Sequence, residues 1–188
     1  KLKTAGIGGG HFRRAHAEQY ARLPASQLVA VVDANPTQAA AVAKAVRALG
    51  ADIALTYQYD KTAKYTQPLA DDLGAKIFEK LDVTQPGSLE SVIEKCGTEF
   101  GKSDFAIHSM AFCEAEDLHG RVIDTSEAGF DSAMNVSCHS FLRMAKALEP
   151  LMTEGGSLIT MSYLGAERVV RNYGVMGIIK AALESAVR

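Results

Sequence analysis

The sequence predicts an α/β protein built on one parallel, doubly wound sheet. Short β-rich apolar runs alternate with helical patterns along nearly the whole chain. The runs are continuously apolar, as is typical of strands buried on both faces. Right-handed crossovers between parallel strands would place helices on both faces of the sheet. We therefore expect a Rossmann-like fold in a single domain covering residues 1–188, with no linker or repeat.

About six strands are expected, each a short apolar run. They fall at residues 3–7, 28–33, 52–57, 76–83, 104–109 and 157–163. The helical patterns between them fall at residues 12–22, 36–49, 61–73, 87–100, 126–150 and 172–188. The second helix has the clearest boundaries, because Pro36 suits a first helical turn, Asp33 or Asn35 can cap it, and Gly50 suits its end.

Composition excludes several classes of function. The chain has 188 residues, 20 basic and 22 acidic side chains, and a formal net charge of −2, so no basic field favours nucleic acid. No long apolar run favours a membrane. The three cysteines lack paired short spacing and no signal segment is evident, which favours the cytoplasm. The five histidines form no cluster at metal-ligand spacing, so we expect no metal.

The stretch "GIGGGHFRRAHAEQY" at residues 6–20 has the pattern of a phosphate-binding turn. Gly8 to Gly10 follow an expected strand and precede an expected helix, where backbone amides can approach a phosphate. Asp33 ends the next strand, and a carboxylate there accepts hydrogen bonds from an adenosine ribose and favours NAD over NADP. Gly8, Gly10 and Asp33 are therefore candidate cofactor-binding residues.

These first 45 residues resemble the glucose-fructose oxidoreductase and inositol dehydrogenase family, in "GIGGGHFRRAHAEQYARLP" and "LVAVVDANP". Arg13 departs from that pattern, since it stands where the third glycine normally lets the helix pack closely on the strand. The alternative interpretation is a plain glycine-rich turn followed by a turn-forming aspartate.

The rest of the chain carries a different signature. The segments "PLADDLGAKIFEKLDVTQPGSLE", "DFAIHSMAF" and "SLITMSYLGAERVVRNYGVMGIIKAALESAVR" resemble the enoyl-acyl carrier protein reductases of fatty-acid synthesis, a branch of the short-chain dehydrogenases. The signature of that family is two tyrosines and a lysine, here Tyr163, Tyr173 and Lys180. Seven residues make nearly two helical turns, so Tyr173 and Lys180 are expected on one face of one helix.

The resemblance implies a reaction and roles. Hydride would pass from NADH to the β-carbon of an enoyl thioester carried by acyl carrier protein. The Tyr173 hydroxyl would then donate to the enolate oxygen, and Lys180 would bind the nicotinamide ribose. Tyr163 would line the acyl pocket or relay a proton.

The resemblance also implies a cofactor trough and an acyl pocket. Residues at the carboxyl ends of strands would line the trough, where parallel sheets bind ligands. They are Gln58, Asp82, Ser109 and Ala111. Met176 and Phe112 would line the acyl pocket, although a methionine at helical spacing is as readily a core residue. Cys113, beside the trough, has no positive neighbour in the sequence that would lower its pKa.

The two resemblances meet near residue 45 and suggest a hybrid chain. The reductase family's own phosphate loop would follow residue 33 and is replaced, and the chain would end inside the helix of Lys180, leaving the acyl pocket without one wall. Two alternatives therefore stay open: a non-catalytic nucleotide-binding domain, and a sugar or polyol dehydrogenase. By resemblance, residues 126–150 and 172–188 would supply interfaces of a homo-oligomer.

Overall fold

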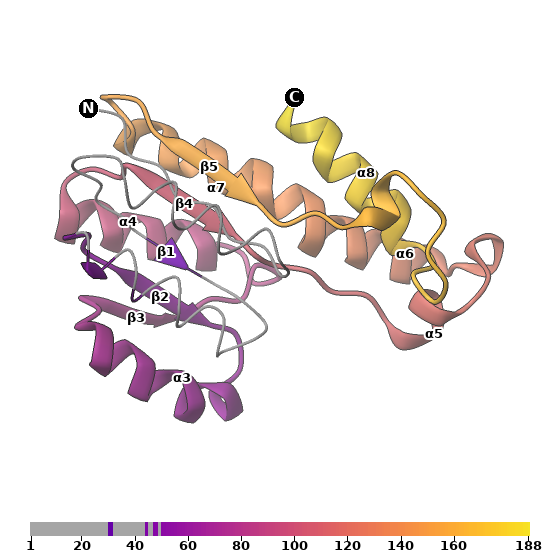
Figure 1. The fold of residues 1–188 in the computed structure, drawn as a ribbon, viewed down its shortest axis with the longest axis horizontal. Coiled ribbons are helices and arrows are strands. Elements are labelled where there is room, and N and C mark those ends of the chain that lie inside the picture. The colour runs from indigo at the N-terminus through magenta and orange to yellow at the C-terminus, as the bar shows by residue number, and fades with distance from the viewer. Residues whose placement is uncertain (1–29, 32–43, 45–46, 49) are drawn as a thin grey trace. The chain divides into compact units, whose positions relative to one another are not determined.

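A computed structural model describes residues 30–31, 44, 47–48 and 50–188 of the chain (Figure 1). The strand expected at 3–7, the helix expected at 12–22, and the candidates Gly8, Gly10 and Asp33 lie outside these residues. The chain divides into two compact units. We call residues 1–109 with 145–160 the sheet unit, and residues 110–144 with 161–188 the helical unit.

The sheet unit carries the parallel strands that the sequence predicts. Strands β1 (Ala30–Val31), β2 (Ala54–Tyr57) and β3 (Ile77–Lys80) form one parallel sheet in that order. Strands β4 (Phe105–His108) and β5 (Ser157–Thr160) form a second parallel pair. Strand β4 lies beside β1, so the chain runs from β1 to one side through β2 and β3 and then to the other side through β4 and β5 (Figure 1). Such a reversal marks the ligand edge of an open parallel sheet.

Apolar side chains explain why these strands form. All four residues of β4 are buried, and the start of β2 is buried as well. Phe105 and Ile53 are fully buried, which matches the continuous apolar runs that predicted doubly covered strands. Burying one such side chain contributes roughly 1.5–3 kcal/mol.

Helices α3 and α4 of the sheet unit match the expected ranges 61–73 and 87–100 to within one residue. Helix α3 spans Asp60–Leu73 and ends at Gly74, whose φ of 58° is the left-handed conformation that glycine adopts readily. Helix α4 spans Ser88–Phe100 and lies between two further glycines with positive φ. A short 3-10 helix, η3 (Glu149–Leu151), precedes β5.

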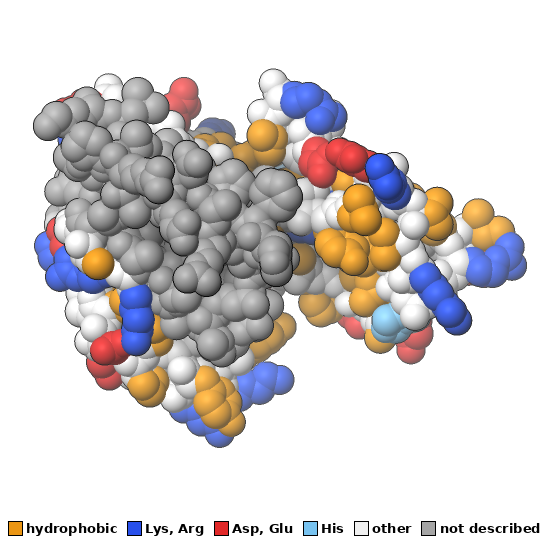
Figure 2. Space-filling view, in the orientation of Figure 1, with side chains coloured by type: hydrophobic (Ala, Val, Ile, Leu, Met, Phe, Trp, Pro, Cys, Tyr) orange, Lys and Arg blue, Asp and Glu red, His pale blue; other side chains and the backbone are white. Residues whose placement is uncertain are grey.

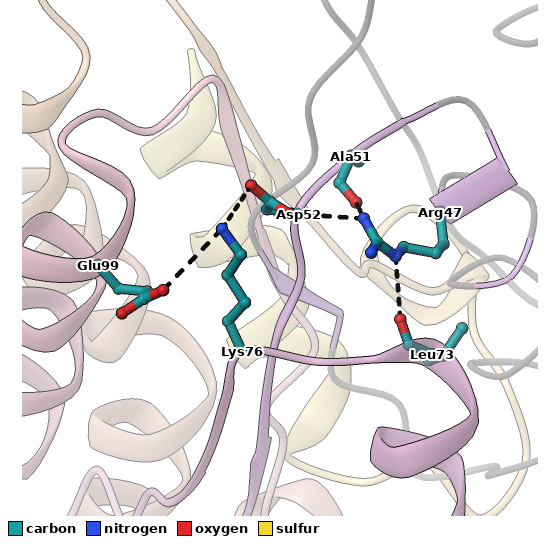
Figure 3. A network of polar contacts seen from close by, with 6 residues as sticks. All are labelled: Arg47, Ala51, Asp52, Leu73, Lys76 and Glu99. Carbon is teal, nitrogen blue, oxygen red and sulfur yellow. Dashed lines mark hydrogen bonds and ion pairs between the residues drawn. The ribbon is translucent and has the colours of Figure 1, made fainter.

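A polar network secures the edge of the sheet at which β2 and β3 begin (Figure 3). The Arg47 guanidinium donates to the carbonyls of Leu73 and Ala51 at 3.0 and 2.8 Å. Asp52 pairs with Lys76 at 3.0 Å, which joins the residues just before the two strands. This edge is opposite the carboxyl ends of the strands, so the network supports the fold rather than the candidate cofactor site.

The helical unit contains short helices. They are α5 (Ala115–His119), η1 (Val122–Asp124), α6 (Glu127–Met134), η2 (Asn135–His139), the first residues of α7 (Ser140–Leu148), η4 (Leu164–Ala166) and α8 (Met176–Val187). The helix expected at 126–150 is present as α6, η2 and α7 in unbroken succession, and its middle part, η2, is a π-helical turn. One extra residue in such a turn re-aims the side chains that follow, a feature frequent at functional sites.

The helix expected at 172–188 is wrong at its start. Helix α8 begins at Met176, so Tyr173 lies in the turn before it rather than on one helix face with Lys180. The physical reason is local: Asn172 has a φ of 60°, which an α-helix does not accommodate. The Tyr173 carbonyl nevertheless accepts the Gly177 amide at 3.3 Å, so the turn leads directly into α8.

Candidate active site

Tyr163 and Tyr173 come together in the helical unit. Their ring centroids lie 4.6 Å apart, with the ring planes inclined by 54°. Tyr163 immediately precedes η4 and is half exposed, while the Tyr173 ring is more deeply placed and lies against Gly165. A side chain at Gly165 would overlap that ring, so the glycine gives Tyr173 its place. The structure thus brings together the two tyrosines that the sequence singles out.

Lys180 is a buried cation on α8. Its side chain is 5% exposed, and its Nζ donates to the Met161 carbonyl at 2.7 Å. Burial lowers the pKa of the Lys180 ammonium, while Cys138 acts weakly in the opposite direction. A lysine is rarely held inside a protein unless it has a role there, because removing the charge from water is costly.

The surroundings of Tyr173 keep its hydroxyl protonated. Burial raises the pKa of this phenol, and its neighbours Tyr163 and Cys113 raise it further. A neutral phenol donates one hydrogen bond, so Tyr173 is suited to donate to an oxygen that gains negative charge.

Two side chains of α8 fasten the segment that leads to Tyr163. Lys180 donates to the carbonyl of Met161, and the Ser162 hydroxyl donates to Glu184, one helical turn further along. Sequence reasoning missed Ser162 and Glu184. The signal was the four-residue spacing of Lys180 and Glu184, which places both side chains on one helix face.

The segment that follows β4 is held by the π-helical turn. Ser137 of η2 accepts the Phe112 amide at 2.9 Å and donates to the Phe112 carbonyl at 3.2 Å. Phe112 is half buried, and Ala111 beside it is exposed. Burial raises the pKa of the Cys113 thiol, and the Asp117 and Glu114 carboxylates raise it further.

Three candidate cofactor residues follow strands of the sheet unit. Gln58 comes directly after β2, Asp82 two residues after β3, and Ser109 directly after β4. Because β2 and β3 run parallel, with Tyr57 opposite Lys80, Gln58 and Asp82 follow the strands at the same edge of the sheet. All three are partly exposed, as residues that contact a ligand must be.

Asp82 also has local partners. Its Oδ1 accepts from the Thr84 amide at 3.0 Å and from the Thr84 hydroxyl at 2.7 Å, and its own amide donates to Ser88 at 3.1 Å. These contacts shape the turn into α4 and hold the carboxylate in place. Its assignment to the adenine stays a prediction.

A cavity of about 400 Å³ opens beside Tyr173 in the helical unit. Its lining is mainly apolar and includes Val122, Val169, Tyr173 and Ile178. Figure 2 shows hydrophobic side chains gathered over this region, where α6 and α8 lie in Figure 1. Met176 is 4% exposed and does not line this cavity, so its assignment to an acyl pocket stays a prediction, as does that of Phe112.

Within the part of the chain that the structure describes, no three histidine, cysteine or acidic side chains are grouped so that they could hold a metal ion. Among those same residues, no helix is both long and apolar enough to cross a bilayer.

The sheet unit is built on parallel strands, and the helical unit holds a buried lysine on α8 with Tyr173 in the turn before that helix. Residues 38–188 match the family model described as enoyl-(acyl carrier protein) reductase. The chain belongs to this family.

Curated relatives support the same family. The chain is 43% identical to an NADH-dependent enoyl-(acyl carrier protein) reductase of Rickettsia bellii over 148 residues. The aligned part covers 79% of this chain and 56% of the relative. A reductase of the same description from Rhizobium meliloti is 42% identical over 154 residues, covering 82% of this chain and 57% of the relative. The chain therefore spans little more than half the length of these relatives.

Solved structures show the fold. An enoyl-(acyl carrier protein) reductase of Anaplasma phagocytophilum, solved in complex with NAD, has a TM-score of 0.79 and 43% identity, over 86% of this chain and 63% of that one. The enoyl-(acyl carrier protein) reductase (NADH) of Aquifex aeolicus has a TM-score of 0.81 and 36% identity, over 88% of this chain and 67% of that one. The Rossmann-like fold class predicted from the sequence is confirmed by these neighbours.

Proposed function

We propose that this chain reduces the double bond of trans-2-enoyl thioesters carried by acyl carrier protein, with NADH as reductant, in the cytoplasm. The observation that carries the proposal is the contact of Tyr163 with Tyr173, in the same unit as the buried Lys180, in a chain that belongs to the enoyl reductase family. The names of the relatives, which specify NADH, support the choice of reductant.

Each unit by itself carries residues suited to binding part of a dinucleotide. The carboxyl ends of β2, β3 and β4 present Gln58, Asp82 and Ser109, and the reversal of strand order beside β1 is the edge where such sheets bind nucleotides. The buried Lys180 ammonium carries two further N–H groups besides the one it gives to Met161, enough to bind ribose hydroxyls. When bound, NADH supplies a hydride for the β-carbon of the substrate.

Tyr173 has the central role in the proposed mechanism. As the β-carbon gained a hydride, negative charge would move to the thioester oxygen, and the Tyr173 hydroxyl would donate a hydrogen bond to that oxygen. A proton from water would then reach the α-carbon and complete the reduction. Its raised pKa keeps this proton on the phenol at neutral pH. The Lys180 charge favours negative charge nearby, and the Tyr163 ring holds the Tyr173 ring in place.

A separate proposal concerns residues 1–37, which precede the family match, and their part in cofactor binding. The family match begins at residue 38, and the sequence before it has the dinucleotide pattern of another family. This supports a chain of mixed origin in which Gly8, Gly10 and Asp33 contribute to cofactor binding, and calorimetric titration with NADH of the Gly8→Val variant tests it. Unchanged affinity would contradict it.

Turnover tests the proposed reaction. We expect the chain to oxidise NADH in the presence of a crotonyl thioester, and Tyr173→Phe to lower kcat by about a hundredfold, since removing one oxyanion donor typically costs that much. Tyr65→Phe is the matched control, because Tyr65 is 66% exposed on α3 of the sheet unit. No turnover, or equal kcat in both variants, would contradict the assignment, and absence of NADH binding as well would leave a structural domain.

A further inference from the structure

Asp117 is a buried carboxylate that the proposed mechanism does not use. It lies on α5 and is 8% exposed. We propose that Asp117 is a positioning residue for Tyr173, joining α5 to α6 through its side chain and to the Tyr173 turn through its backbone. This inference rests on the proposed function of Tyr173.

The side-chain link is a two-point contact with the first turn of α6. The Asp117 carboxylate accepts the Ser126 amide on Oδ1 at 2.9 Å and the Ser126 hydroxyl on Oδ2 at 2.9 Å. Ser126 is the N-cap of α6, because its hydroxyl accepts the Gly129 amide at 3.0 Å. A side chain at Gly129 would overlap Oδ2 of Asp117, so this turn is shaped to receive the carboxylate.

The backbone link joins α5 to the turn that carries Tyr173. The Val175 amide donates to the Asp117 carbonyl at 3.4 Å. A Cβ at Gly174 would overlap the same carbonyl and lie 2.6 Å from that of Leu118. Gly174 does not have a positive φ, so what demands glycine here is the close approach to α5 rather than the backbone conformation.

Both the side-chain link and the backbone link run through Asp117, so a change in the Asp117 side chain also affects the turn that carries Tyr173. If the carboxylate is lost, α5 is released from Ser126, and the Gly174 turn that packs on α5 loses its fixed support. Tyr173 precedes that turn by one residue and its ring has little freedom against Gly165. The charge of Asp117 also raises the pKa of Cys113, and Cys113 in turn raises that of Tyr173, so the three groups lie near one another.

The first experiment separates kcat from KM. We expect Asp117→Asn, which keeps one acceptor oxygen, to lower kcat about tenfold with KM changed by less than about twofold, and Asp117→Ala to lower kcat further, since small misplacements of a reacting group are costly. Asp124→Asn is the control, because Asp124 lies in the same segment and is exposed, paired only with Arg121 among the described ion pairs. In the Tyr173→Phe background, Asp117→Asn should change kcat by less than about twofold.

The outcomes distinguish the two proposals. A slow Tyr173→Phe variant with unchanged kcat in Asp117→Asn and Asp117→Ala would overturn the positioning role alone. Equal losses from Asp117→Asn in both Tyr173 backgrounds would show a general structural effect and would also overturn it. An unaffected Tyr173→Phe variant would contradict the proposed function instead.

A second measurement does not depend on activity. In protein labelled with ¹³C at the tyrosine Cζ, the Tyr173 resonance is the one that disappears in Tyr173→Phe. We expect it to shift in Asp117→Asn and not in Asp124→Asn. If Asp117→Ala does not fold, Gly174→Ala displaces the same turn from the other side and should give the same shift. A Tyr173 resonance that stays in place in Asp117→Asn and Gly174→Ala would overturn the inference.

Discussion

The sheet unit and the helical unit bury different kinds of side chain. The largest buried side chains of the sheet unit are mostly apolar, and its charges form ion pairs at the surface, such as Lys95–Glu79 and Lys76–Asp52. Among the described residues, the helical unit buries the charged side chains Asp117 and Lys180 besides Ser137 and Ser140, whereas the buried polar residues of the sheet unit are Ser103 and His108. The helical unit also exposes large apolar side chains, among them Ile123, Leu164 and Val169.

This difference indicates a division of work within the chain. Burial of apolar side chains stabilises a fold and needs no specific partner. A buried polar group lowers the stability unless it has a hydrogen-bond or charge partner. Such groups are retained where chemistry or the placement of a reactive group needs them. We therefore expect the sheet unit to contribute mainly to the stability of the fold, and the helical unit to carry the proposed chemistry.

The largest expected effect on stability is in the sheet unit. Phe105→Ala removes a fully buried ring from β4, and we expect it to lower the free energy of unfolding by about 3–5 kcal/mol. Urea denaturation followed by far-ultraviolet circular dichroism measures this change. A loss below about 1 kcal/mol would show that the core of the sheet unit is not organised as described.

A smaller effect, of opposite sign, is expected in the helical unit. Lys180→Met replaces a buried charged side chain by an apolar one of similar length. We therefore expect the free energy of unfolding at pH 7 to rise by about 1 kcal/mol, while the affinity for NADH falls. Because burial lowers the pKa of Lys180, this lysine loses its proton at lower pH in the folded wild type than in the unfolded chain. The free energy of unfolding of the wild type therefore rises as pH increases from the folded pKa to the unfolded pKa of this lysine.

The difference in free energy of unfolding between Lys180→Met and wild type should therefore narrow as pH rises toward 10.5, the ordinary pKa of lysine. Tyr173 is present in both proteins and cancels in this comparison, although its raised pKa makes each lose stability at still higher pH. Thermal unfolding at a series of pH values measures the difference. A constant difference across the series would contradict a buried, charged Lys180.

The smallest effect is expected for a surface ion pair. Lys95 and Glu79 lie 2.6 Å apart, but both side chains are substantially exposed. We expect Lys95→Ala to change the free energy of unfolding by less than about 1 kcal/mol, with less effect still at 1 M salt, because water and ions screen the pair. A loss of 2 kcal/mol would show that surface charge contributes to this unit as much as its core does.

The sheet unit could largely be predicted from the sequence. The apolar runs at residues 52–57 and 104–109 contain β2 and β4, and α3 matches the helix expected at 61–73 to within one residue. These features are determined by residues close in sequence, through burial on both faces and the backbone freedom of glycine. Strands β3 and β5 lie within the expected runs at residues 76–83 and 157–163 and are shorter by a few residues.

The helical unit was harder to predict, because its geometry depends on contacts between distant segments. The π-helical turn at η2 has no sequence signal, and the start of α8 at Met176 depends on the conformation of Asn172. Tyr173 and Lys180 were found through their motif. Asp117 was missed, since its partners Ser126 and Val175 lie nine and 58 positions away and only folding brings them to it.

The most direct test of the central claim follows the hydride itself. NADH carrying deuterium at both positions of the nicotinamide C4 is incubated with the chain and a crotonyl thioester, and the product is analysed by mass spectrometry. The account predicts a butyryl thioester that has gained one deuterium, and a rate of formation about a hundredfold lower in Tyr173→Phe. A crotonyl thioester recovered unchanged, or a butyryl product without deuterium, would contradict it.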